Sequence, residues 1–135
     1  MTGTILDVSG LEVSFDIGGE PAVAVDRLGF SLRAGETLGI VGESGSGKSM
    51  AALAVMGLIP SPPGSVSGGS IRFRGRELVG MDEEERRRIR GKDIAMIFQE
   101  PMTALNPVFT VGDQIAETLM LHEGLERRAA WEKAA

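Results

Sequence analysis

The sequence of 135 residues contains no cysteine and only one histidine, His122. The absence of cysteine excludes disulfides, thiolate zinc sites, iron–sulfur clusters and cysteine nucleophiles within this stretch. A single histidine is too few for a metal site built from histidines. The start of the chain lacks the basic and apolar segments of a secretory signal, and the longest apolar run, residues 50–59, is far shorter than the about 20 residues of a membrane span. We therefore expect a soluble, cytoplasmic chain that reaches a membrane only through a partner.

The chain also lacks a surplus of positive charge. It has 14 basic and 19 acidic residues, for a net charge of -5, so nucleic acid is not expected as its main partner. The run Arg86-Arg87-Arg88 could form a phosphate or nucleic-acid patch. Each arginine has acidic neighbours at helical spacing, however, which favours a solvated and self-paired helix face. With 42% hydrophobic residues, the remaining composition is that of a globular domain with a real core.

The periodicity of apolar residues predicts strands followed by helices. We expect half-buried strands over residues 11–15, 22–32 and 70–74, strands buried on both faces over 37–41 and 94–98, and loops over 61–69 and 99–107. We expect a buried helix over 47–59, a charged helix over 82–90 with Asp82 as N-cap and Gly91 as C-cap, a helix over 111–121, and a further helical stretch from about 125. The result is an α/β fold.

One loop has the spacing G-x-x-x-x-G-K-[ST] of a phosphate-binding loop. Its residues are Gly42, Glu43, Ser44, Gly45, Ser46, Gly47, Lys48 and Ser49. Glycines allow consecutive backbone N–H groups to surround phosphate oxygens, and the following helix adds its positive N-terminus. The Lys48 ammonium would contact the β and γ phosphates, and the Ser49 hydroxyl is an oxygen ligand of the kind that Mg²⁺ prefers. The predicted strand before the loop and helix after it give this motif its required context.

A second segment selects among the families that use this loop. Residues 93–101, read DIAMIFQEP, predict a buried strand that ends in Gln99 before a proline-bracketed loop. With the stretch from Leu32 to Ser49 and the run 99–107, QEPMTALNP, the sequence resembles the ATP-binding subunits of ABC transporters. Within these it is most similar to the dipeptide and oligopeptide importers, which include nickel importers. The resemblance extends from about Leu11 to Leu121.

The resemblance implies roles for two further residues. Phe15 matches the aromatic residue that stacks on adenine, although it could instead be a core phenylalanine. Gln99 matches the glutamine that opens the Q-loop and approaches Mg²⁺ and the attacking water, although it could instead make only local hydrogen bonds at a strand end. Lys48 and Gln99 would be the catalytic residues, and Ser49 and Gln99 would bind the metal ion.

The family's signature segment, its acidic Mg²⁺-binding strand and its switch histidine are absent, and His122 lies in the wrong place for that histidine. The resemblance therefore implies that residues 1–135 are the N-terminal part of a nucleotide-binding domain. This part would comprise an antiparallel β subdomain, part of a RecA-like core, and the start of a helical subdomain. We expect this stretch alone to lack turnover.

The whole subunit would bind ATP and Mg²⁺ at the cytoplasmic face of the membrane. It would pair with a second ATPase subunit and with permease subunits, and hydrolyse ATP to import peptides or a related solute. A GTPase is disfavoured because no Asn-Lys-x-Asp stretch is present, and a phosphate-loop kinase would lack the Gln-Glu-Pro loop. A non-transport ABC-type ATPase and a nucleotide-binding piece without turnover remain open.

Overall fold

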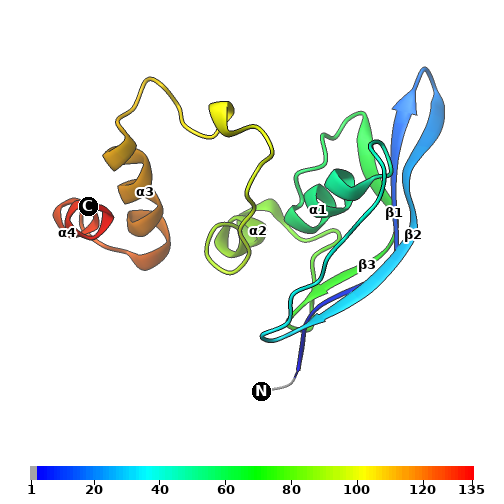
Figure 1. Cartoon of the computed structure of the whole chain (residues 1–135), viewed down its shortest axis with the longest axis horizontal. Coiled ribbons are helices and arrows are strands. Elements are labelled where there is room, and N and C mark those ends of the chain that lie inside the picture. The colour runs from blue at the N-terminus through cyan, green and yellow to red at the C-terminus, as the bar shows by residue number, and fades with distance from the viewer. Residues whose placement is uncertain (1–2) are drawn as a thin grey trace. The chain divides into compact units, whose positions relative to one another are not determined.

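The computed structural model describes residues 3–135 and divides into two compact units, one ending at Arg86 and the other running from Arg87 to Ala135 (Figure 1). The strands of the first unit are β1 (Thr4–Ile17), β2 (Glu20–Arg33), β3 (Gly64–Phe73) and β4 (Arg76–Glu77), and its helix is α1 (Lys48–Met56). The short helix α2 (Glu83–Ile89) spans the division. The second unit contains the 3₁₀ turn η1 (Pro101–Thr103) and the helices α3 (Val111–Glu123) and α4 (Arg127–Ala134).

The four strands form one antiparallel sheet in the order β2-β1-β3-β4. The β1–β2 hairpin turns at Gly18 and Gly19, whose φ angles of 66° and 89° suit glycine. The Asp16 carboxylate accepts a hydrogen bond from the Gly19 N–H at 2.7 Å and closes this turn. The sequence prediction of two strands joined by a turn over residues 16–21 is confirmed, although both strands extend further than expected.

The core of the first unit lies between one face of this sheet and α1. Its largest fully buried side chains are Leu11, Ile71, Val8 and Val13. Helix α1 contacts β1 and β2 (Figure 1) and buries Ala51, Ala54 and Met56, while its other positions remain partly exposed. The predicted helix is confirmed, but the expectation that it is buried all round is wrong, because only one side of it packs on the sheet. It also ends at Met56 instead of Ile59, because Gly57 adopts a left-handed conformation with a φ of 67°.

The predicted loop over residues 61–69 is wrong from Gly64 onward, because β3 begins at that residue. Glycine and serine dominate this stretch and have little intrinsic preference for strands. The backbone nevertheless pairs with β1, where Phe15 lies opposite Gly64 and Ser14 opposite Ser65. Tertiary pairing with the central strand therefore overrides the local composition.

The two predicted buried strands, 37–41 and 94–98, are also wrong. Apart from one isolated bridge at Ile94, these segments have no regular secondary structure, and no strand among residues 3–135 pairs with them along their length. Several of their apolar side chains are exposed, with Val41 at 93% and Ile97 at 99%. An apolar run becomes a strand only where a neighbouring strand satisfies its N–H and C=O groups.

The charged helix has the ends that the sequence predicts. The Asp82 carboxylate accepts a hydrogen bond from the Glu84 N–H at 3.3 Å at the start of α2. After α2 the chain turns at Gly91, whose φ of 83° is left-handed. These local signals depend only on residues within one turn of the helix, which is why the sequence predicts them well.

The second unit is built on a pair of helices, α3 and α4. The Thr110 hydroxyl accepts a hydrogen bond from the Asp113 N–H at 3.1 Å and caps α3. The small residues Ala116 and Ala130 are buried in this pair, and a Cβ at Gly112 would overlap the Trp131 ring. The predicted helix over 111–121 and the later helical stretch are confirmed. Among residues 3–135, no helix has the length and apolar character needed to cross a membrane.

Glu77, the last residue of β4, accepts hydrogen bonds from residues on both sides of the turn between β3 and β4. It accepts hydrogen bonds from the Ser70 hydroxyl and from the backbone N–H groups of Ile71 (2.9 Å) and Val79 (3.1 Å). Partial burial acts to raise the pKa of Glu77, but these hydrogen bonds and the nearby Arg72 guanidinium together lower it. Glu77 therefore favours its charged form more than a free glutamate does.

Candidate functional site

The loop over residues 42–49 joins the segment after β2 to the start of α1, and its glycines are required by its geometry. Gly45 and Gly47 have φ angles of 82° and 91°, which L side chains rarely adopt. A Cβ at Gly47 would also lie only 2.5 Å from the carbonyl oxygen of Ala24 in β2. At Gly42, a Cβ would lie 2.5 Å from the Ser46 hydroxyl oxygen. Glycine thus lets the loop curl tightly on itself and press against β2.

Lys48 folds back over this loop. Its ammonium donates hydrogen bonds to the carbonyl oxygens of Gly42 (2.5 Å) and Glu43 (2.7 Å), and to the Ser46 hydroxyl (3.1 Å). An ammonium has three N–H donors, so the loop supplies an acceptor for each one. The cation is therefore fixed beside the exposed backbone of the loop, where it can attract an anionic ligand.

The N-terminus of α1 adds to this positive character. Its cap is Gly47, which makes no side-chain capping bond, and the first turn contains no acidic residue. The first N–H groups of a helix lack partners within the helix and carry partial positive charge. Because no carboxylate competes for them here, the loop and helix end together form a cradle suited to phosphate groups. Ser49, the second residue of α1, is exposed beside this cradle.

Phe15 lies on the same face of the sheet as the loop. Its neighbour two positions back, Val13, pairs with Val25, and the Val25 side chain lies 3.3 Å from where a Gly47 Cβ would be. Side chains two residues apart on a strand project from the same face, about 7 Å apart. Phe15 is half-buried, unlike the fully buried Val13. The ring is thus partly accessible to solvent and less buried than the core side chains of the sheet.

The remaining predicted site residue, Gln99, belongs to the second unit. It is exposed at a bend that precedes η1, instead of at the end of a strand. The predicted residues 42–49 are thus gathered in one loop of the first unit, with Phe15 on the face against which that loop packs. Among residues 3–135, no cluster of three or more acidic, histidine or cysteine side chains could hold a metal ion. The oxygen ligands predicted for Mg²⁺ within this stretch remain Ser49 and Gln99.

Two features of the site were not predicted from the sequence. One is that the backbone of β2 at Ala24 packs closely against Gly47, and the other is that Gly64 leaves space beside the Phe15 ring. The sequence predicts a loop at Gly64, because this residue follows three prolines and precedes serines and glycines. Ile71 and Phe73 alternate with Arg72, but this alternation predicts only the last part of the strand, because Val66 lies five positions before Ile71 and does not continue it.

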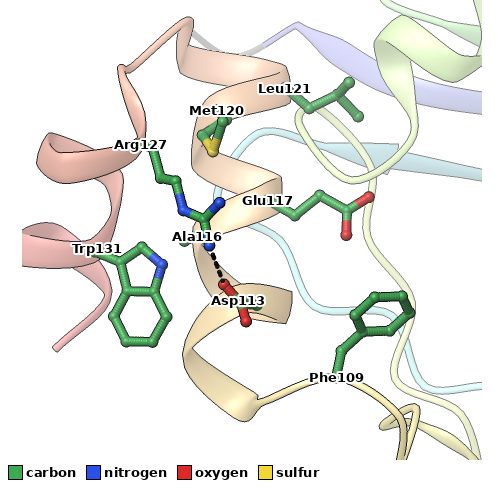
Figure 2. Close-up of a pocket in the computed structure, with 8 residues that line it drawn as sticks. All are labelled: Phe109, Asp113, Ala116, Glu117, Met120, Leu121, Arg127 and Trp131. Atoms are coloured by element: carbon green, nitrogen blue, oxygen red, sulfur yellow. Dashed lines mark hydrogen bonds and ion pairs between the residues drawn. The ribbon is translucent and has the colours of Figure 1, made fainter.

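A separate groove of about 600 Å³ lies in the second unit, between α3, α4 and Phe109, which precedes the N-cap of α3 (Figure 2). Its lining consists of Phe109, Asp113, Ala116, Glu117, Met120, Leu121, Arg127 and Trp131. Arg127 and Asp113 form an ion pair of 3.3 Å in this groove, with Trp131 beside it. The groove is mainly apolar and contains none of the residues predicted to bind phosphate.

The chain is similar in sequence to proteins of one family. A family model described as "ABC transporter" matches residues 25–135. The chain is 49% identical over 135 residues to a putative peptide import ATP-binding protein of Brucella abortus (strain 2308), with 96% of this chain and 40% of that protein covered. It is 50% identical over 130 residues to the oligopeptide transport ATP-binding protein OppD of Escherichia coli (strain K12), with 96% and 38% covered. The chain thus spans about 40% of the length of these curated relatives.

Solved structures share the fold. The ATP-binding cassette MJ0796, in a dimeric post-hydrolysis state bound to ADP and Pi, matches with a TM-score of 0.80 at 22% identity. The match covers 96% of this chain and 53% of that one. A second dimeric structure of the same bacterial cassette matches with a TM-score of 0.79. The α/β fold expected from the sequence is therefore confirmed at the level of its overall architecture.

Proposed function

Because this chain belongs to the ABC transporter family, we propose that residues 42–49 bind the phosphates of ATP and that the whole protein hydrolyses ATP to drive peptide import. The observation that carries the proposal is the cradle itself. Its glycine-rich backbone, the uncapped start of α1 and the Lys48 ammonium all present positive charge at one place. Relatives at 49–50% identity that are named for peptide import support the choice of solute.

The residues present also fit a magnesium ion bound with the nucleotide. Mg²⁺ takes oxygen ligands, and the exposed Ser49 hydroxyl stands next to Lys48 at the start of α1. When bound, the ion would neutralise charge on the phosphate oxygens. We propose that Ser49 would bind the ion, and that Gln99 would act on the ion and on the water that attacks the terminal phosphate. Lys48 itself orients the phosphates and balances their charge, because phosphoryl transfer depends mainly on positioning and electrostatics.

The proposal extends to partners and location. We propose that the whole protein works as a pair of ATPase subunits on membrane-spanning permease subunits, at the inner face of the cell membrane. The dimeric cassettes with the same fold support the pairing, and the peptide import names of the relatives support the permeases. A nickel or other solute importer would use the same ATP site, so the solute must be identified by transport.

The test is peptide uptake by the reconstituted whole transporter. Vesicles containing the ATPase and its permease are loaded with ATP and Mg²⁺, and uptake of a labelled oligopeptide is followed together with phosphate release. Uptake that requires ATP and disappears with Lys48→Ala supports the proposal. ATP hydrolysis without association with any permease would instead favour a non-transport ATPase of this family.

A further inference from the structure

The first residue of β3, Gly64, is a glycine for reasons of space alone. Its φ lies outside the left-handed region, so its backbone conformation does not require glycine. Glycine inside a strand weakens the strand, and it often marks a close approach of other atoms. A Cβ at Gly64 would lie 2.7 Å from the Cε1 atom of the Phe15 ring, 2.7 Å from the Ile59 side chain and 2.8 Å from the Pro60 carbonyl oxygen. The missing side chain thus makes room for the ring and for the turn that precedes β3.

Both cross-strand neighbours of Phe15 are small. Phe15 pairs with Gly64 of β3 on one side and with Ala22 of β2 on the other. Directly opposite residues project from the same face of a sheet, so the ring is flanked on this face by positions that carry little or no side chain. The ring is half-buried, and its face of the sheet is the one that Gly47 contacts through Val25.

We propose that Gly64 is a positioning residue for the Phe15 ring, and that it holds the ring where it can stack on the base of the nucleotide. This inference rests on the proposed function, in which ATP binds to residues 42–49. A side chain at position 64 would push the ring away from its place, while the phosphate cradle, which does not touch Gly64 at any of the contacts above, would keep its shape.

The test compares two ligands that differ in the base. Calorimetry on the whole protein measures the affinity for ATP and for inorganic tripolyphosphate, which has phosphates but no ring to stack. We expect Gly64→Ala to weaken ATP binding by about fivefold or more, the lower end of the value of one aromatic–base stack. The affinity of Gly64→Ala for tripolyphosphate should stay within about twofold of that of the unaltered protein. A general loss of structure would instead weaken the binding of both ligands.

Gly68→Ala is the matched control. Gly68 lies on the same strand, pairs with β1 at Glu12, and also lacks a left-handed φ. The three atoms nearest to a Cβ there all belong to the Glu12 side chain, and the nearest of them, a carboxylate oxygen, lies at 3.1 Å. Because this flexible side chain can move aside, we expect Gly68→Ala to leave both affinities unchanged. A loss of ATP affinity equal to that of Gly64→Ala would overturn the proposal.

A double variant shows whether Gly64 acts through the ring. In a Phe15→Ala background, Gly64→Ala should cause no further loss of ATP affinity, because the ring is already gone. A further loss, or an equal loss for tripolyphosphate, would overturn the proposal. If Gly64→Ala alone does not fold, the double variant should fold and bind ATP like Phe15→Ala. If the double variant also fails to fold, the glycine is needed to avoid the Pro60 carbonyl oxygen and not the Phe15 ring, and the proposal is overturned. If Lys48→Ala leaves both affinities unchanged, the proposed function fails and not only the role of Gly64.

Discussion

The ammonium of Lys48 lies 2.5 Å from the carbonyl oxygen of Gly42, so the lysine of the loop is bonded to the loop's first glycine. This bond closes the loop across six positions and places the cation inside the curl of the backbone. A phosphate that enters the cradle meets a charge already in position. To bind the phosphate, the ammonium must exchange the loop acceptors that use its three N–H donors for phosphate oxygens.

Replacing this lysine should remove much of the affinity for ATP. We expect Lys48→Ala to weaken ATP binding well over tenfold, because the hydrogen bonds of an ammonium to phosphate are charge-assisted. Calorimetry on the whole protein measures the change. Lys92→Ala removes an exposed lysine outside the loop and should leave the affinity unchanged. Equal ATP affinity of Lys48→Ala and the unaltered protein would show that this loop does not bind the phosphates of ATP through Lys48.

Phe15 allows stacking and core packing to be separated. If the ring stacks on adenine, Phe15→Ala should weaken ATP binding by about 1–3 kcal/mol. Because the ring is only half-buried, the free energy of unfolding should fall by less than the ~3–5 kcal/mol of a buried phenylalanine. The buried Phe73 of the same sheet is the comparison, since Phe73→Ala should cost that full amount. A large stability loss with unchanged ATP affinity would make Phe15 a core residue.

Gln99 should act in turnover and not in binding. In the reconstituted transporter, Gln99→Ala is expected to lower transport-coupled ATP hydrolysis about tenfold or more, with ATP affinity within about twofold. The physical reason is that a group that positions the water contributes in the transition state, whereas the cradle binds the phosphates in the ground state. Normal coupled turnover in this variant would refute the role.

Glu77 gives the first unit a specific sensitivity to acid. Its hydrogen bonds and Arg72 hold its pKa below that of a free glutamate, so its stabilisation is fully present above the unfolded pKa of about 4.3. The stabilisation is then lost as the pH falls through the lower folded pKa. We expect Glu77→Gln to lower stability at pH 7 and to flatten the dependence of the unfolding temperature on pH below about 4.3. Equal slopes for both proteins would contradict this, and Glu20→Gln, an exposed glutamate in β2, serves as the control.

The exposed apolar segments predict the behaviour of residues 1–135 when they are produced alone. We expect this stretch to self-associate, because side chains such as Val41 and Ile97 are almost fully exposed and their backbones have no ladder partners in the described part of the chain. We also expect no steady ATP turnover, since Lys48, Ser49 and Gln99 are its only predicted catalytic or metal-binding groups. Light scattering and phosphate release test the two expectations. A monodisperse monomer with steady turnover would contradict both.

The features that the sequence predicts well are those set by residues close together in the chain. The loop before α1, the Asp82 and Gly91 ends of α2, and the hairpin turn after Asp16 each depend on a few neighbouring side chains. The start of β3 could not be predicted in this way. Its glycines and serines are held extended only by a strand that lies far away in the sequence.

The apolar runs 37–41 and 94–98 show a different limit. Their composition indicates how well they would fit inside a sheet, but not whether a partner strand stands beside them. The role of Gly64 was hidden for a related reason, because it depends on the position of the Phe15 ring on another strand. Sequence patterns therefore identify the phosphate loop more readily than the surface on which a base could lie.

The order of strands in the sheet has a consequence for folding kinetics. β1 and β2 are joined by a two-residue turn, so their pairing closes almost no loop and should form within about 1–10 μs, like an isolated hairpin. β3 joins the other edge of β1 only after the chain has passed through α1. We therefore expect Gly47 to meet its support on β2 early, and the Phe15 ring to acquire its place beside Gly64 last. Variants at position 64 should then accelerate unfolding more than they slow refolding.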